Sequence, residues 1–328
     1  QLTGAMLQPA TWYRLGSSHI GRGNVLADEF DAALFGGATF GTLAGLRGRP
    51  YLIVGSTDLV SGAEFDFASD QLGRLCTSID AVPLAFAVAA SSAVPLVFTP
   101  LTLANHGPTC RHDALQGPAD DVPEAPRPRL VHADHDRYAA PGVQYIHLVD
   151  GGVSDNLGVR RIVDYVAQVG GIEHVLRLLA ATDGRVAQHL VFVNVGSERR
   201  GPSALDAQRE TAGTLQMLAA IADGGVGRAS RATELAFDEA LDAWQTRLRS
   251  LAPPYSTVRI YSLDIGLASV PDPQLVARAQ AIPTAFRITA EHRELLAEVA
   301  RVGVERAPDL ARLRTALAAE SPGDVAAR

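Results

Sequence analysis

Two kinds of pattern alternate along most of this chain, and the alternation constrains its fold more than any other feature. Short, continuous apolar runs, which suit buried strands, occur at residues 51–55, 143–149, 189–195 and 257–263. Stretches with apolar residues at helical spacing occur at residues 158–169, 203–221 and 231–251, and two or three more helices are expected from Asp272 onward. Strands that alternate with helices indicate an α/β layer fold.

The composition excludes several classes of protein. Hydrophobic residues make up 47% and charged residues 20% of the 328 residues, which rules out a disordered chain, a collagen-like fibre and a coiled coil. All 29 basic residues are arginine, so mechanisms that need a lysine, such as a Schiff base or a P-loop, are excluded. The net charge is −7 without a basic block, so we expect no nucleic-acid partner.

The longest uncharged run, residues 81–110, is long enough to be considered as a membrane span. Pro83, Pro95 and Pro100 interrupt it, and a broken helix would leave backbone polar groups unsatisfied in lipid. We therefore expect a buried helix over residues 84–90, followed by an apolar loop.

Residues 105–142 form an irregular insertion in which Pro, Asp, Arg and His cluster without a period. An insertion of this length is either a lid over a functional site or a surface loop. His132 and His135 have a spacing that metal ligands use, but no third ligand follows at motif spacing. We expect neither a metal nor a cofactor.

The most informative stretch for chemistry is residues 145–158 (YIHLVDGGVSDNLG). A buried strand ends at Asp150, Gly151 and Gly152 turn the chain, and Asp155 or Asn156 caps the helix that begins near residue 158. The functional crevice of an open α/β sheet lies at the carboxyl ends of its strands, which makes Asp150 a candidate catalytic carboxylate. The alternative is an aspartate that only closes the turn by accepting backbone amide bonds.

His147 is close to Asp150 in sequence but is not expected to be its partner. Side chains alternate between the two faces of a strand, so Ile146, Leu148 and Asp150 share one face and His147 points to the other. We expect His147 to be a core or cross-sheet residue.

Several sequence blocks together resemble the bacterial patatin-like phospholipases. They lie in the family's order at residues 30–43 (FDAALFGGATFGTL), 49–67 (RPYLIVGSTDLVSGAEFDF), 87–101 (AVAASSAVPLVFTPL), 148–158 (LVDGGVSDNLG) and 282–289 (IPTAFRIT). The resemblance implies a three-layer α/β/α sheet, related to the α/β-hydrolases and missing its first strands. Residues 1–305 would be the C-terminal portion of a single domain of this family, and residues 306–328 a helical or frayed tail.

The resemblance also implies an activity, the hydrolysis of acyl esters of lipids by a Ser–Asp dyad without histidine. The family's Asp-Gly-Gly or Asp-Gly-Ala motif maps onto Asp150, Gly151 and Gly152, so Asp150 would be the base that takes the nucleophile's proton and returns it to the leaving alcohol. The implied partner is a lipid substrate at a membrane surface, of phospholipase A, lysophospholipase or lipase type. The oligomeric state is left open.

The chain departs from the family at the nucleophile. The family's Gly-x-Ser-x-Gly and its Gly-rich oxyanion loop are absent from the sequence, and the nearest match has Thr39 at its centre. Ser91 and Ser92 lack flanking glycines and Ser56 has glycine only before it, so we interpret all three as packing or turn residues. The family's order places the missing elements N-terminal to Gln1, and the chain as given is expected to be inactive.

Two further questions stay open at this level. A non-catalytic lipid- or protein-binding module on a patatin-like scaffold is the alternative to an enzyme. Cys76 and Cys110 form either one disulfide or two idle thiols, and the pair slightly favours a cell-envelope or secreted location over the cytoplasm.

Overall fold

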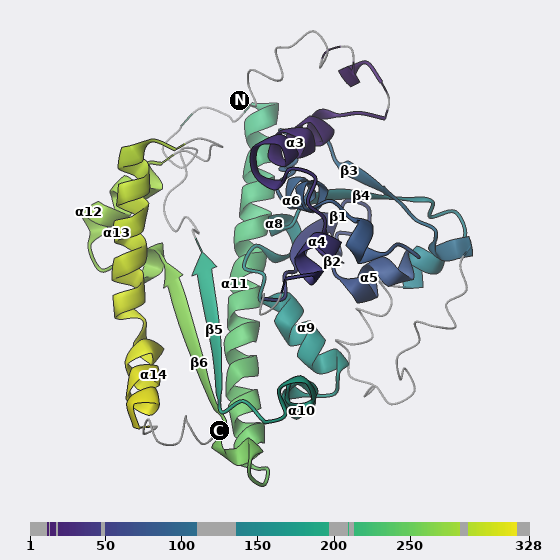
Figure 1. The fold of residues 1–328 in the computed structure, drawn as a ribbon. Coiled ribbons are helices and arrows are strands. Elements are labelled where there is room, and N and C mark those ends of the chain that lie inside the picture. Colours follow the sequence, from purple (N-terminus) through teal and green to yellow (C-terminus); the bar gives the residue numbers. More distant parts are fainter. Residues whose placement is uncertain are drawn as a thin grey trace. The chain divides into compact units, whose positions relative to one another are not determined.

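The computed structural model describes residues 14–17, 19–46, 50–109, 136–196, 213–282 and 288–319, together with Trp12 and Arg209. The protein is mixed α/β, with the helices and strands shown in Figure 1. Its chain divides into two compact units. The first unit comprises Gln1–Gly170 and Ala222–Thr233, and the second comprises Gly171–Ile221 and Glu234–Arg328. The described strands form two sheets, one in each unit.

The sheet of the first unit has four antiparallel strands in the order β2-β1-β4-β3. These strands are β1 (Val54–Asp58), β2 (Glu64–Phe67), β3 (Leu101–Ala104) and β4 (Tyr145–Asp150). In this register Ser56 lies opposite Phe65 on one side and opposite Asp150 on the other. Asp150 therefore ends an inner strand, on the sheet face that carries Phe65.

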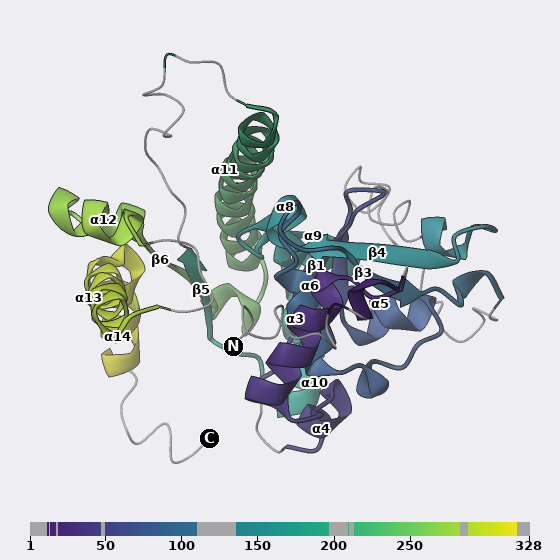
Figure 2. The same cartoon turned by 90° about the horizontal axis from the view of Figure 1, so that it is seen from above.

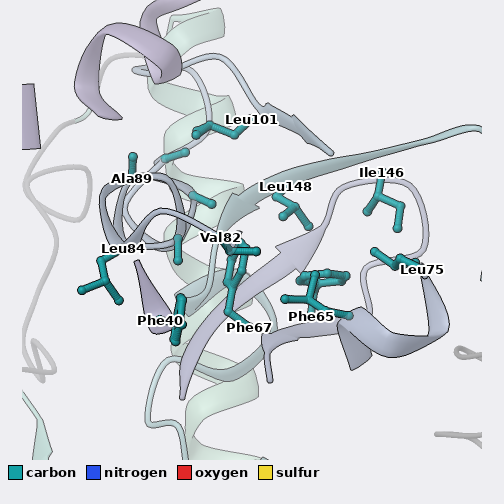
Figure 3. Packing of buried hydrophobic residues seen from close by; sticks show 14 of the residues in the cluster. Phe40, Phe65, Phe67, Leu75, Val82, Leu84, Ala89, Leu101, Ile146 and Leu148 are labelled. Carbon is teal, nitrogen blue, oxygen red and sulfur yellow. The ribbon is translucent and has the colours of Figure 1, made fainter. Parts of the chain in front are cut away.

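Helices cover both faces of this sheet. The elements are α3 (Arg22–Phe30), α4 (Phe40–Ala44), α5 (Ser69–Arg74), α6 (Leu84–Ser91), α8 (Gly152–Asp155) and α9 (Arg160–Gln168). On one face Phe65, Phe67, Ile146 and Leu148 form the core with residues of α3, α5 and α6 (Figure 3). Figure 2 shows α8 and α9 on one side of this sheet and α3, α5 and α6 on the other. On the α9 side, Arg161 pairs with acidic residues of β2.

The second unit is built on two parallel strands, β5 (His189–Gly196) and β6 (Arg259–Gly266). Its helices are α10 (Ile172–Asp183), α12 (Pro273–Gln280), α13 (Ala290–Arg306), α14 (Pro308–Ala319) and the C-terminal part of α11 (Thr214–Arg249). Phe192 of β5 stacks edge-on against Phe237 of α11, with ring centroids 5.5 Å apart. Figure 1 shows α13 and α14 beside β6, where Asp309 accepts a hydrogen bond from the N–H of Ser262.

Several predicted elements are confirmed, with shifted bounds. The buried helix over residues 84–90 is α6, and strands form at three of the predicted runs as β4, β5 and β6. The first strand begins only at Val54, and Tyr51, Leu52 and Ile53 before it are exposed. Where the sequence predicts two helices, over residues 203–221 and 231–251, the described part from Thr214 onward is one helix, α11. No helix among the described residues is long and apolar enough to cross a membrane.

The insertion over residues 105–142 is described only at its two ends, and residues 110–135, with His132 and His135, lie outside the described residues. Asn105 ties the ends together, because its Nδ2 donates to the carbonyls of Tyr138 (2.8 Å) and Val143 (2.6 Å). In the part of the chain that the structure describes, no group of three or more His, Cys, Asp or Glu side chains is placed to hold a metal ion. The division into a domain over residues 1–305 and a tail stays a prediction.

Candidate functional site

Asp150 is fixed through its backbone on two sides. Its N–H donates to the carbonyl of Ala93, which follows α6, at 3.1 Å. Its own carbonyl accepts a hydrogen bond from Thr57 Oγ1 at 2.9 Å. The loop after α6 and strand β1 therefore both hold the end of β4.

The carboxylate of Asp150 is half-buried, and one of its oxygens is held. Oδ1 accepts the N–H of Gly152 at 2.8 Å, so this aspartate does close the turn, as the alternative interpretation predicts. Among the described residues no hydrogen bond reaches Oδ2. Burial raises the pKa of the Asp150 carboxyl, and the hydrogen bond from Gly152 opposes that rise. Within the described residues, Oδ1 is therefore the carboxylate oxygen that the turn holds.

The two glycines after Asp150 are required by space rather than by backbone torsion. Gly151 has φ −64° and ψ −28°, which any residue adopts. A Cβ at Gly151, however, would lie 2.5 Å from the carbonyl oxygen of Gly55. A Cβ at Gly152 would lie 3.0 Å from Asp150 Oδ1 and 2.8 Å from Asn156 Oδ1. Close approach of backbone and side chains therefore explains the Gly-Gly pair.

A hydroxyl pair that the sequence reasoning missed supports the turn. Thr57 and Ser154 place their Oγ atoms 2.8 Å apart, and the N–H of Ser154 donates to Thr57 Oγ1 at 3.2 Å. The Thr57 hydroxyl donates to the carbonyl of Asp150, and the Ser154 hydroxyl lies 3.4 Å from the carbonyl oxygen of Gly151, to which it donates. The two residues are 97 positions apart, so no local pattern could have linked them.

The N-cap residue of α9 is Val159, so neither Asp155 nor Asn156 is the cap that the sequence predicts. Asp155 still contributes to the helix start. Its Oδ2 accepts the N–H of Arg160, the first residue of α9, at 2.9 Å, and the side chain is buried. The helix begins two residues later than predicted, after Gly158 at φ +67°. Asn156 is exposed.

His147 does not face Asp150. Its Nδ1 lies 3.0 Å from Oγ1 of Thr102, its cross-strand partner on β3, while Ile146 and Leu148 on the Asp150 face are buried in the core. The predicted alternation of faces along β4 is confirmed, and His147 is a cross-sheet residue.

The hydroxyl residues considered as nucleophiles have structural contacts. Thr39 Oγ1 caps α4 by accepting the N–H of Thr42 at 3.3 Å. The fully buried Ser56 donates to the carbonyl of Val149 at 2.8 Å. Ser91 contributes its backbone carbonyl to the N–H of Gly151 at 3.2 Å, and Ser92, like Ser91, is half-buried.

Of the two cysteines, Cys76 is disulfide-bonded. Cys110, the second cysteine of the sequence, lies outside the described residues. Of the two alternatives, a disulfide and idle thiols, the bond at Cys76 favours the disulfide.

A half-buried charge cluster lies on the sheet face opposite the core. Arg161 of α9 forms ion pairs with Glu64 and Asp66 of β2, and its guanidinium passes over Gly55, where a Cβ has no room. Burial raises the pKa of Glu64 to about 8 and that of Asp66 to about 6, although the positive charge of Arg161 opposes both shifts. Two acidic residues separated by one position in EFDF are the sequence signal that could have indicated this face.

Comparison of the chain with protein-family models and with curated proteins finds no match. The resemblance to patatin-like phospholipases therefore rests on the sequence blocks alone.

Proposed function

We propose that this chain belongs to a patatin-like acyl-ester hydrolase, in which Asp150 is the base of a Ser–Asp dyad. The family's three-layer sheet is part of this proposal, as is a nucleophilic serine N-terminal to Gln1 in the family's order. The observation that carries it is the carboxyl group of Asp150 at the end of β4. Gly152 fixes its Oδ1, and Oδ2 has no hydrogen bond among the described residues.

The proposed reaction is an acyl transfer through the serine. Oδ2 would accept the proton of the serine hydroxyl while the serine oxygen attacks the ester carbonyl carbon. The bond to the alcohol then breaks, and the alcohol leaves with the proton. Water next attacks the acyl-enzyme, releases the acid and restores the serine. The raised pKa of Asp150 makes its carboxylate a stronger base than an exposed aspartate.

The substrate class in this proposal is an acyl ester of a lipid, and phospholipids, lysophospholipids and glycerides are the candidates. A second function, a non-catalytic lipid- or protein-binding module, is favoured by one observation. The 328 residues contain no Gly-x-Ser-x-Gly.

The DNA upstream of the Gln1 codon separates the two functions. An in-frame Gly-x-Ser-x-Gly preceded by a Gly-rich loop supports the enzyme, and a start or stop codon there supports the binding module. With such a segment present, the extended protein should react with a fluorophosphonate probe and hydrolyse p-nitrophenyl esters. The chain as given should do neither above background.

Asp150→Asn in the extended protein tests the role of the carboxylate directly. We expect the rate of ester hydrolysis to fall by roughly 10²–10⁴-fold, the usual contribution of a positioned base. The matched control is Glu294→Gln, which neutralises an exposed carboxylate on α13 and should leave the rate unchanged. Wild-type turnover in Asp150→Asn would show that Asp150 is not the base.

A further inference from the structure

The loop between α6 and β3 exposes three apolar side chains within four residues. Val94 is 43%, Leu96 53% and Val97 52% exposed, and we call these three residues the apolar tip. Residues 81–110 contain no Asp, Glu, Arg or Lys, so no charged side chain of the loop itself interrupts the tip. Exposed apolar residues scattered singly are ordinary, whereas a cluster indicates an interaction surface.

Hydrogen bonds and a buried side chain fix the loop that carries the apolar tip. The N–H groups of Val97 and Phe98 donate to the carbonyl of Val94 at 3.2 and 3.0 Å, and Phe98 is buried in the core. Thr99 Oγ1 accepts the N–H of Gly23 in α3 at 3.0 Å. The loop is thus anchored at its base, and its apolar side chains stay exposed despite that anchoring.

Leu96 adopts an unfavourable backbone conformation, and burial of its side chain does not offset the energetic cost. Its φ is +74°, a left-handed backbone that costs a residue with a bulky side chain about 1–2 kcal/mol. More than half of its surface is exposed, so the strained residue gains little from packing. Residues strained in this way cluster at functional sites in proteins.

The apolar tip adjoins the Asp150 turn and carries a positive charge at its side. Val94 directly follows Ala93, whose carbonyl accepts the N–H of Asp150. Nη2 of Arg22, an exposed residue of α3, lies 3.4 Å from the carbonyl oxygen of Leu96. An apolar tip with a guanidinium beside it complements a phospholipid surface, where acyl chains lie beneath phosphate groups.

We infer that the apolar tip and Arg22 dock this protein onto a phospholipid surface, next to the turn that carries Asp150. The inference deepens the proposed function and rests on it for the nature of the substrate. Val94, Leu96 and Val97 enter the boundary between headgroups and acyl chains, and Arg22 pairs with a lipid phosphate. Docking here brings an ester in the surface close to Asp150.

The test is flotation of the full chain with vesicles of equimolar phosphatidylcholine and phosphatidylglycerol. Asparagine tolerates a left-handed backbone better than leucine, so Leu96→Asn should be at least as stable as the wild type in urea. The same variant should bind the vesicles about tenfold more weakly, because it removes an inserted apolar side chain. A merely structural role of Leu96 would not move stability and binding in opposite directions.

Two further variants complete the test. Arg22→Gln should also weaken binding, and Leu235→Gln, which changes an exposed leucine of α11 in the other unit, should not. Failure of the wild-type chain to bind vesicles, or equal binding by Leu96→Asn and Leu235→Gln, overturns the inference. A change in self-association without a change in vesicle binding would assign the tip to contacts between copies and also overturn it.

The vesicle-binding test and the test of the proposed enzyme activity can fail independently of each other. Asp150-dependent hydrolysis of a water-soluble ester by the extended protein, without vesicle binding, would retain the enzyme and overturn the docking surface. Vesicle binding that depends on Leu96, without ester hydrolysis by the extended protein, would retain the docking surface and overturn the enzyme.

Discussion

Thr57 is the side chain on which the backbone of the Asp150 turn most depends. It is buried, donates to the carbonyl of Asp150, accepts the N–H of Ser154, and places its Oγ1 2.8 Å from Ser154 Oγ. Thr57→Val keeps the shape but removes the hydroxyl, so it should lower the free energy of unfolding by about 1–3 kcal/mol, the cost of unsatisfied buried polar groups. Urea denaturation measures this loss. In a double-mutant cycle with Ser154→Ala, additive losses would show that the hydroxyl pair contributes nothing.

The close approach of Gly151 to Gly55 predicts that a side chain at position 151 destabilises the protein. Gly151→Ala would place a methyl group 2.5 Å from the carbonyl oxygen of Gly55, and the backbone on one side must shift. We expect the free energy of unfolding to fall by about 1–3 kcal/mol. Gly45→Ala is the matched control, because Gly45 has φ −73° and its nearest atom would be 3.7 Å away. Equal stability of the two variants would contradict the close-approach explanation.

Residue patterns predict part of this site and miss part for a physical reason. The alternation of side chains along a strand is local, so it correctly separates His147 from Asp150. Thr57 and Ser154 contact each other only after β1 pairs with β4, and that pairing joins segments more than 90 residues apart. Sequence reasoning sees neither the pairing nor the carbonyl that each hydroxyl reaches.

At the scale of elements, β1 shows why an apolar run does not locate a strand. The run at residues 51–55 predicts a strand there, but β1 covers Val54–Asp58 and buries Ser56, Thr57 and Asp58. Hydrogen bonds make this burial tolerable, because the carbonyls of β4 accept both hydroxyls and Arg137 pairs with Asp58. The partners of a strand therefore decide its bounds as much as its hydrophobicity.

Helix α11 offers a test at the same scale. Glycines at 224, 225 and 227 lie between the two predicted helices, yet the described helix continues through them. Space is open around Gly224 and Gly225, so alanine there adds helix propensity without a collision. Gly224→Ala and Gly225→Ala should each raise the free energy of unfolding by about 1 kcal/mol and increase the helical signal in circular dichroism.

The control for the helix prediction is Gly158→Ala. Gly158 has φ +67°, so the same substitution should destabilise the protein by about 1 kcal/mol. A loss of stability in both α11 variants would mean that the helix needs flexibility at these glycines.

At the scale of the whole molecule, the alternation of apolar runs and helical stretches correctly predicts a mixed α/β protein. It does not predict that the described strands fall into two sheets, one antiparallel and one parallel. An apolar run records burial but not the neighbour that a strand pairs with. The charge cluster on the outer face of the antiparallel sheet was missed for the same reason, because Glu64 and Asp66 meet Arg161 only when β2 and α9 pack together.

That cluster makes the stability of the molecule depend on pH. Burial raises the pKa of Glu64 from 4.5 to about 8, with Asp155 and Asp164 adding to the rise, and that of Asp66 from 3.8 to about 6. The folded state therefore binds protons that the unfolded state has already released, so stability falls as the pH rises through these windows. We expect the free energy of unfolding to fall by roughly 1–3 kcal/mol between about pH 5 and about pH 9. Urea denaturation at each pH would show this loss as a falling midpoint.

Glu64→Gln should remove most of that decrease, because its neutral amide keeps a hydrogen-bonding group beside Arg161 without a charge to bury. The variant should therefore be more stable than the wild type at about pH 9, where Glu64 is ionised, and should differ less from it at about pH 5, where Glu64 is protonated in the folded state. The exposed Glu294, changed to glutamine, should keep the wild-type profile. A Glu64→Gln profile parallel to that of the wild type would show that Glu64 already carries its charge in the folded protein at neutral pH.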